Sequence, residues 1–305
     1  MPLPLAIRGH TLTWGARTYV MGILNITPDS FSGDGLLNSP SSSSQISEGN
    51  GVGQGGGALD QALAFLALGA DILDVGGEST RPGAQPVGAD EEMARVVPVI
   101  EAIRRESDAL ISVDTYKASV AEAALKAGAD IVNDVWGLRA DPALGEVAAR
   151  YAAPLVLMHN RSKPANAEIE ARLGGRYVGM EYADLLTDVK RELLESVALA
   201  RSAGVPDEHL ILDPGIGFGK TVEQNLALIN RLDEIRSLGF PVLLGPSRKS
   251  FIGYTLDLPA DQRLEGTAAA VAVGITRGAD VVRVHDVATM VRVARMTDAI
   301  VRLNS

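Results

Sequence analysis

The chain has 305 residues, and its composition of 46% hydrophobic and 22% charged residues excludes a disordered or collagen-like protein. A net charge of −10 and the absence of cysteine argue against a nucleic-acid partner and exclude disulfides, zinc–thiolate sites and thiol nucleophiles. Because no apolar run is long enough to cross a bilayer and no signal peptide is visible, we expect a cytoplasmic enzyme that does not bind membranes.

Short apolar runs alternate with amphipathic stretches along the chain. Residues 1–18 contain Arg-Gly and Trp-Gly turn signals and predict an N-terminal hairpin. Strands are then expected at residues 20–26, 72–75, 110–113, 131–135, 155–158, 210–212, 242–244 and 281–284. Helices are expected at residues 59–68, 91–105, 117–127, 142–151, 182–203, 222–238, 266–276 and, with Asp286 as its cap, 286–303. The continuous apolar runs are typical of parallel strands that are covered on both faces.

A short phrase, Gly-Ala-Asp, joins a predicted helix to a predicted strand at residues 69–71, 128–130 and 278–280. Glycine at the end of a helix followed at once by a strand is the short connection of an α/β repeat. Eight strands and eight helices predict an α/β protein with a (β/α)8 TIM barrel, forming one domain over residues 1–305. An open doubly wound sheet is the alternative, since barrel closure is not visible in a sequence.

One segment interrupts this alternation. Residues 39–57 are rich in serine and glycine and predict a flexible loop insertion between the first strand and the first helix. Its match to the dinucleotide pattern GxGxxG follows no strand, so we interpret it as a linker.

Polar side chains follow nearly every predicted strand, where barrel enzymes hold their ligands. Asp114 and Asp213 could instead cap the helices that follow them, and Asn133 could bind backbone groups of the barrel. Caps do not explain why Arg81, Lys249, Arg283 and His285 are expected on the same rim. We therefore interpret the rim as a binding site.

The rim has two chemical halves. Asp114, Asn133 and Asp213 offer carboxylate and amide groups that suit the guanidine-like edge of a pterin or a guanine. The other half suits a phosphate group, since it contains Asn25 and the cationic side chains. A single asparagine without a carboxylate cluster suggests Mg²⁺ held mainly by substrate phosphates and water.

The motifs on this rim resemble those of the dihydropteroate synthase family. The resemblance runs in family order from about Met21 to the C-terminus and rests on residues 21–31, 74–83, 111–117, 133–137, 213–220, 245–250 and 283–286. It implies a transferase of folate biosynthesis that condenses 6-hydroxymethyl-7,8-dihydropterin pyrophosphate with 4-aminobenzoate, giving 7,8-dihydropteroate and pyrophosphate. It also implies a homodimer and competition of sulfonamides with aminobenzoate.

The resemblance implies three sets of site residues. The pterin would bind to Asp114, Asn133, Met158, Asp213 and Lys249. The pyrophosphate and Mg²⁺ would be held by Asn25, Arg283 and His285, with Asn25 as the metal ligand. The aminobenzoate site would comprise Thr80, Arg81, Pro82, Phe218, Lys249 and Ser250. Among these residues, Asn25, Lys249, Arg283 and His285 would be catalytic.

The first loop departs from the family pattern. The chain has Ser-Phe-Ser-Gly-Asp-Gly at residues 30–35, where the family usually has Ser-Phe-Ser-Asp-Gly-Gly, and the serine- and glycine-rich insertion follows. This departure motivates a second hypothesis, a non-catalytic pterin-binding paralogue. A third hypothesis is a methyltetrahydrofolate-dependent methyltransferase barrel, against which the aminobenzoate set at Thr80–Pro82 and Lys249–Ser250 argues.

Overall fold

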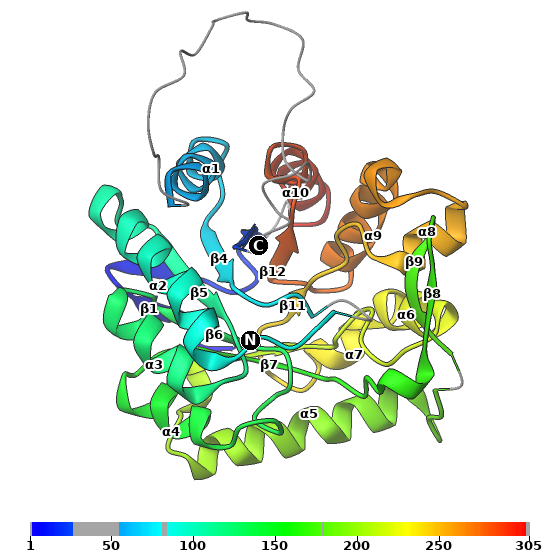
Figure 1. Cartoon of the computed structure of the whole chain (residues 1–305). Coiled ribbons are helices and arrows are strands. Elements are labelled where there is room, and N and C mark those ends of the chain that lie inside the picture. The colour runs from blue at the N-terminus through cyan, green and yellow to red at the C-terminus, as the bar shows by residue number, and fades with distance from the viewer. Residues whose placement is uncertain (1, 27–54, 81–83, 179, 303–305) are drawn as a thin grey trace, which may run out of the picture.

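Eight parallel strands lie at the centre of the protein, and helices surround them (Figure 1). The structure is a computed structural model and describes residues 2–26, 55–80, 84–178 and 180–302. The central strands are β3 (Tyr19–Asn25), β4 (Ile72–Gly76), β5 (Leu110–Asp114), β6 (Ile131–Asp134), β7 (Leu155–Met158), β10 (Leu210–Asp213), β11 (Leu243–Leu244) and β12 (Val281–Val284). Each strand begins and ends within one residue of its prediction.

The strand order distinguishes the barrel from an open sheet. The strands are hydrogen-bonded in the order β10-β7-β6-β5-β4-β3-β12-β11. One further parallel bridge joins Leu212 of β10 to Val242, and the Leu212 N–H donates to the Pro241 carbonyl over 2.9 Å. The two ends of the sheet therefore meet in a nearly closed barrel, which confirms the predicted TIM-barrel class.

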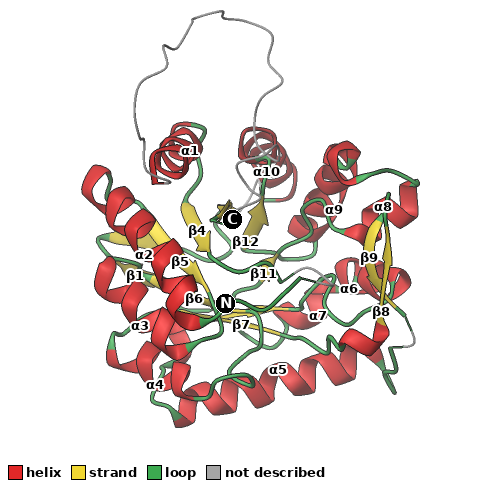
Figure 2. Ribbon diagram, viewed as in Figure 1, coloured by secondary structure: helices red, strands yellow, loops and turns green. Residues whose placement is uncertain are grey.

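Helices cover the outside of the barrel (Figure 2). They are α1 (Gly55–Ala67), α2 (Ala89–Glu106), α3 (Ala118–Ala127), α4 (Ala143–Arg150), α5 (Leu185–Ser202), α6 (Val222–Asn230), α7 (Leu232–Arg236), α8 (Ser250–Leu256), α9 (Leu264–Thr276) and α10 (Val287–Val301). Short 3-10 turns occupy Pro164–Asn166, Asp207–His209 and Ala260–Gln262. The predicted helix at 222–238 is thus two helices, α6 and α7, that meet at Arg231.

The glycines of the repeated Gly-Ala-Asp phrase have the backbone conformation that their connections require. Gly128 ends α3 with a φ of 113°, and Gly69 and Gly278 have φ values of 97° and 99°. A side chain is disfavoured in this left-handed region, whereas glycine adopts it without steric cost.

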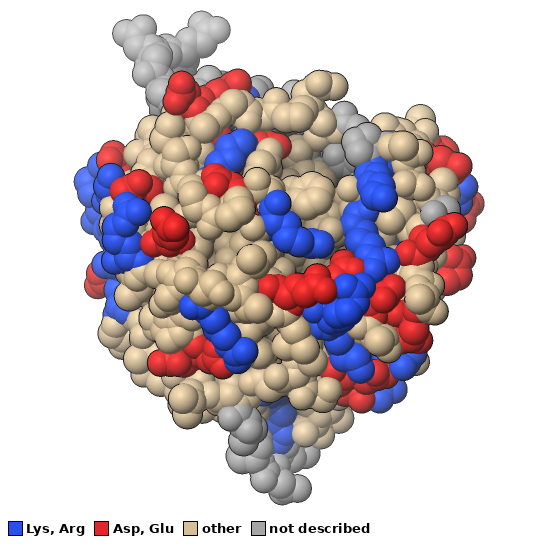
Figure 3. Space-filling view, turned by 90° about the horizontal axis from the view of Figure 1, so that it is seen from below, with Lys and Arg blue, Asp and Glu red and all other residues tan. Residues whose placement is uncertain are grey.

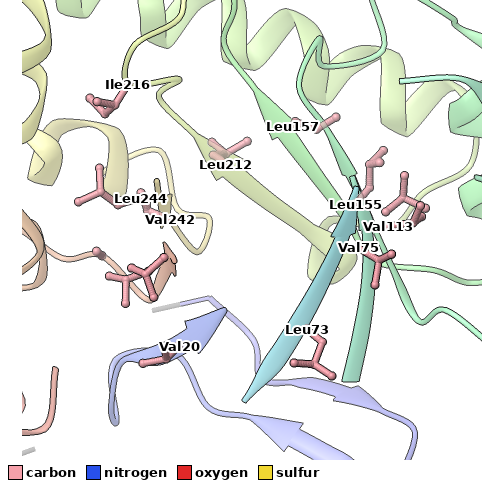
Figure 4. Packing of buried hydrophobic residues seen from close by; sticks show 14 of the residues in the cluster. Val20, Leu73, Val75, Val113, Leu155, Leu157, Leu212, Ile216, Val242 and Leu244 are labelled. Carbon is pink, nitrogen blue, oxygen red and sulfur yellow. The ribbon is translucent and has the colours of Figure 1, made fainter. Parts of the chain in front are cut away.

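Two apolar clusters stabilise the fold on opposite sides of the strands. The larger cluster lies between strands and helices, and Figure 4 shows part of it, including Val20, Leu73 and Val113 on successive strands. Helix α1 packs closely on β3 at Gly22, where a Cβ would lie only 2.7 Å from the Phe65 ring. The smaller cluster comprises Leu5, Leu12, Trp14, Tyr19, Met21, Ile72, Leu110, Ile131, Val156, Ile211, Leu243 and Val281.

The smaller cluster fills the barrel at the amino ends of its strands. Every central strand contributes a side chain to it, and the hairpin of β1 (Leu5–Ile7) and β2 (His10–Leu12) adds Leu5 and Leu12. The predicted N-terminal hairpin therefore exists, and it covers this end of the barrel.

A second antiparallel hairpin, β8 (Ala167–Glu170) with β9 (Gly174–Tyr177), was not predicted from the sequence. It lies beside α8 (Figure 2), where the Tyr254 hydroxyl donates to the Gly174 carbonyl over 3.2 Å. Of the predicted loop at 39–57, residues 55–57 form the start of α1, and the rest lies outside the described residues.

Lys and Arg side chains alternate with Asp and Glu side chains on the face shown in Figure 3. On α5, for example, Arg191 pairs with Asp188 and Glu195. Charges of both signs are therefore mixed on this face.

Candidate active site

The alternation of side chains along each strand brings polar groups into the barrel at its carboxyl end. The register pairs Asn25 with Gly76, Gly76 with Asp114, and Asp114 with Asn133 on four adjacent strands. On the other side, Asp213 pairs with Met158 across β10 and β7. The predicted pterin-site residues on the strands therefore form a polar layer at the carboxyl end of the barrel. Within it, Met158 and Asp213 lie two residues beyond the level of Asn133, because Asn133 pairs with Val156.

An arginine at the centre of this layer holds two carboxylates. Arg283 Nε lies 2.6 Å from Asp74 Oδ2, and Arg283 Nη2 lies 2.5 Å from Asp114 Oδ2. Burial raises the pKa of Asp114 to about 7; Arg283 opposes this shift, and the Asp74 carboxylate adds to it. The predicted phosphate-binding cation and the predicted pterin-binding carboxylate are thus in direct contact.

Asp74 is a functional residue that the sequence reasoning missed. It is fully buried, and its Oδ2 also accepts a 3.3 Å hydrogen bond from Asn133 Nδ2. Asp74 therefore orients both Arg283 and Asn133. A charged residue inside the apolar run Ile-Leu-Asp-Val-Gly was the available signal, because a buried carboxylate requires a partner.

Asp213 and Lys249 face the same space from β10 and from the loop after β11. Asp213 Oδ1 accepts a 2.7 Å hydrogen bond from the Gly215 N–H, while burial raises the pKa of Asp213. Burial lowers the pKa of Lys249 to about 8, although Asp213 opposes this shift. The Lys249 ammonium donates to the Ile216 carbonyl and lies 4.6 Å from the centre of the Phe218 ring.

Neither Asp114 nor Asp213 caps the helix that follows it. The N-cap of α3 is Lys117, and the N-cap of α6 is Thr221, which forms a capping box with Gln224. The alternative interpretation of Asp114 and Asp213 as helix caps is therefore wrong.

The loop between β11 and α8 also orients the next predicted group. The Ser247 hydroxyl lies 3.0 Å from His285 Nδ1 and accepts from the His285 N–H over 3.2 Å. Arg248, in the left-handed region with a φ of 55°, binds both oxygens of Asp286. Asp286 is the N-cap residue of α10, as predicted, but its side chain pairs with Arg248 and makes no capping hydrogen bond.

The predicted aminobenzoate residues are only partly described. Thr80 is half-buried after β4, and Ser250 is the first residue of α8, whereas Arg81 and Pro82 lie outside the described residues. The segment before Thr80 is anchored, because Lys117 pairs with Glu78 and, over 2.5 Å, with the buried Glu92.

The metal donor set is small. Among the described residues, no three carboxylate or histidine side chains are grouped so that they could hold an ion. Asn25 ends β3, and β3 pairs with β12, the strand that carries Arg283. This arrangement fits an ion held mainly by substrate oxygens and water.

The barrel and its rim define a pterin-binding enzyme. The profile of the family described as pterin binding enzyme matches residues 21–285. The chain is 50% identical to the dihydropteroate synthase of Bacillus subtilis, over 94% of this chain and 90% of that one. It is 48% identical to the dihydropteroate synthase of Clostridium beijerinckii, over 94% and 96% of the two chains.

A solved structure gives the same result. The dihydropteroate synthase from Clostridium difficile, crystallised in the presence of pteroic acid, matches with a TM-score of 0.81 and 46% identity over 95% of this chain and 98% of that one. The chain belongs to the dihydropteroate synthase family, whose members are transferases of folate biosynthesis. This confirms the first of the three functional hypotheses. Within the described part of the chain, no helix has the length and apolar character needed to cross a membrane.

Proposed function

We propose that the carboxyl end of this barrel joins 6-hydroxymethyl-7,8-dihydropterin pyrophosphate to 4-aminobenzoate with release of pyrophosphate. The observation that carries the proposal is the Arg283 guanidinium in contact with Asp114. This contact supports the proposal, because a guanidinium suits a departing anion and a carboxylate suits a pterin edge. A substrate that spans the two would have its reactive carbon between them.

The pterin ring would lie on the layer formed by Asp114, Asn133, Met158 and Asp213. Asp114 and Asp213 are acceptors for the N–H groups of the ring edge, and Met158, 3% exposed, offers an apolar contact beside Asp213. Lys249 supplies an N–H donor to the same space. This set of acceptors with one donor suits the hydrogen-bonding edge of the ring.

The pyrophosphate would lie at Asn25, Arg283 and His285. Arg283 already neutralises two carboxylates, so binding of an anion requires it to share its N–H groups between these and the phosphate oxygens. Mg²⁺, bound through Asn25 and the phosphates, would stabilise charge on the departing group.

The aminobenzoate would lie beside Phe218 and Lys249, with Thr80, Arg81, Pro82 and Ser250 completing its site. The amine is neutral and nucleophilic at pH 7, so it needs positioning more than activation. Since the pterin can delocalise positive charge, departure of pyrophosphate can precede attack. No side chain is required as a general base.

The test is an assay of the purified protein with both substrates and Mg²⁺. We expect dihydropteroate and pyrophosphate in equal amounts, with sulfonamides competing against aminobenzoate. Tight pterin binding without pyrophosphate release would support a non-catalytic protein instead. Methyl transfer to a corrinoid partner would support the methyltransferase.

The pterin role of Asp213 has its own test. Asp213→Asn replaces one acceptor oxygen with a donor, and we expect pterin affinity to fall by about tenfold or more. Binding of 6-hydroxymethylpterin measured by calorimetry gives this value directly. Unchanged affinity would contradict the assigned role.

We further propose that the chain acts as one domain, in the cytoplasm, and as a homodimer. Exposed apolar side chains on the adjacent helices α9 and α10 support a contact between two copies; Val273 is 41% exposed, and Met296 and Ile300 are each 63% exposed. Sedimentation should give a dimer for the wild type and a monomer for Met296→Asp. A monomeric wild-type protein would contradict this.

A further inference from the structure

A lysine lies beneath the loop that carries two of the proposed substrate contacts. This loop, residues 213–220, follows β10 and presents Asp213 and Phe218 from its two ends. Gly215, Gly217 and Gly219 have φ values of 70°, 82° and 61°, so the loop follows a path open mainly to glycine. Such a path needs a specific interaction to hold it.

Lys220 supplies that interaction from inside the protein. Its side chain is 2% exposed, and its Nζ lies 2.9 Å from the Gly215 carbonyl and 3.0 Å from the Phe218 carbonyl. A third partner, His159 Nδ1, lies 2.9 Å away. The lysine therefore ties together the two halves of the loop and the segment that follows β7.

The protons of this cluster can be assigned from its geometry. His159 Nε2 lies 3.0 Å from Glu192 Oε2, and a carboxylate can only accept, so the ring proton resides on Nε2. Nδ1 then carries a lone pair that accepts from Lys220. Burial lowers the pKa of Lys220 well below its usual range, but the three partners within 3.0 Å are all acceptors and match the three N–H donors of an ammonium.

Glu192, which fixes the proton on His159 Nε2, is itself held by two arginines. Glu192, on α5, binds Arg161 through Nε over 3.0 Å and lies 3.6 Å from Arg139. Burial lowers the pKa of His159 to about 3, and the charge of Lys220 adds to this shift, so the ring stays neutral near pH 7. A neutral ring is what the assigned hydrogen bonds require.

Close backbone contacts require glycine at two positions of the loop. A Cβ at Gly215 would lie 1.8 Å from the His159 carbonyl oxygen, and a Cβ at Gly219 would lie 2.4 Å from the carbonyl carbon of Arg161. Asn225 adds an acceptor for the Gly217 N–H over 2.6 Å. The loop therefore packs tightly against the segment that follows β7, and Lys220 binds a carbonyl group in each half of it.

We propose that Lys220, oriented through His159 and Glu192, is a positioning residue that holds loop 213–220 so that Asp213 meets the pterin and Phe218 meets the aminobenzoate. The proposal rests on the proposed roles of Asp213 and Phe218. Lys220 touches neither substrate, and its effect on the reaction is transmitted through the two carbonyl groups that it binds.

The test compares two lysine-to-methionine variants of the full chain. In Lys220→Met we expect the KM for aminobenzoate to rise, and the affinity for 6-hydroxymethylpterin to fall, each by about tenfold. The matched control is Lys190→Met, which removes a lysine that pairs over 3.0 Å with Glu234 of α7. Wild-type constants in a folded Lys220→Met variant would overturn the proposal.

A second measurement on the wild type remains decisive if Lys220→Met does not fold. Nitrogen NMR of the histidine rings, with the His159 signal assigned through His159→Gln, should show a proton on Nε2 and none on Nδ1. A proton on Nδ1, or titration near pH 6.5, would overturn the proposal. If Asp213→Asn leaves pterin affinity unchanged, the proposed function fails instead, which separates the two outcomes.

Discussion

The two ends of the barrel interior are made by the same strands and have opposite characters. At the amino end, Ile72, Leu110 and Val281 pack in an apolar cluster that the N-terminal hairpin covers. A few residues further along those strands, Asp74, Asp114 and Arg283 form a buried ionic group. Burial of apolar side chains at the amino end therefore stabilises the fold. At the carboxyl end, burial of charged groups costs part of that stability and arranges those groups for a ligand.

The largest expected effect comes from removing the cation at the ionic end. Arg283→Ala leaves Asp74 and Asp114 buried without a counter-charge, so we expect kcat/KM to fall at least about 100-fold and stability to fall by about 3 kcal/mol. Steady-state kinetics and urea unfolding measure the two losses. A variant with normal turnover and normal stability would show that the ion pairs are unimportant.

A substitution at the apolar end should lower stability without changing the kinetic constants. Leu110→Ala leaves a cavity in a cluster where this side chain is 1% exposed, and we expect a stability loss of about 2–5 kcal/mol. The kinetic constants of the folded fraction should match the wild type, since the cavity lies at the opposite end from the site. A large rise in KM without a stability loss would erase the distinction between the two ends.

The pH dependence of the ionic end follows from Asp114, whose pKa is raised by burial from 3.8 to about 7. Between these values the folded state binds more protons than the unfolded state, so the contribution of Asp114 to stability falls as pH rises through about 7. The ionised carboxylate is the better acceptor for a pterin, so pterin affinity should rise over the same range.

Asp114→Asn is the control for this pH dependence. It removes the titrating group, so the pH profiles of stability and of pterin affinity should both become flatter. A titration of the pterin itself would affect the wild type and the variant equally. Calorimetric binding of 6-hydroxymethylpterin between pH 5.5 and about 8.5 spans the expected change. An unaltered profile in the variant would assign the titration to another group.

The smallest effect is expected on the surface. Arg201 lies on α5, is 55% exposed as a side chain and pairs with the similarly exposed Asp207 over 2.6 Å. Exposed ion pairs contribute little, so Arg201→Ala should change stability by less than about 0.5 kcal/mol and leave kinetics unchanged. This variant is the baseline for Arg283→Ala, and a larger loss would mean that exposure does not govern the value of these pairs.

Strand periodicity and glycine-ended helices predicted the barrel well, because both are local patterns. The sequence did not reveal the hairpin of β8 and β9, whose short polar strands lack an apolar alternation. The break between α6 and α7 was missed for a similar reason, since Arg231 is an ordinary residue within a helical pattern. Tertiary contacts decide both features.

The site was predicted less completely than the barrel. Motifs identified Asp114, Asp213 and Arg283, which the structure brings to one end. The partners that orient them, such as Asp74 and Lys220, become visible only when distances are known. Asp286 was predicted correctly as the N-cap residue of α10, but sequence position cannot reveal that its side chain pairs with Arg248, 38 residues earlier.

The most direct test of the central claim is a crystal structure with a non-reactive pterin pyrophosphate analogue, 4-aminobenzoate and Mg²⁺. We predict the pterin edge on Asp114, Asn133 and Asp213, and the phosphates on Arg283 and His285. Aminobenzoate should lie beside Phe218 and Lys249. Ligands bound anywhere other than the carboxyl end of the barrel, or a pterin that does not contact Asp213, would contradict the account.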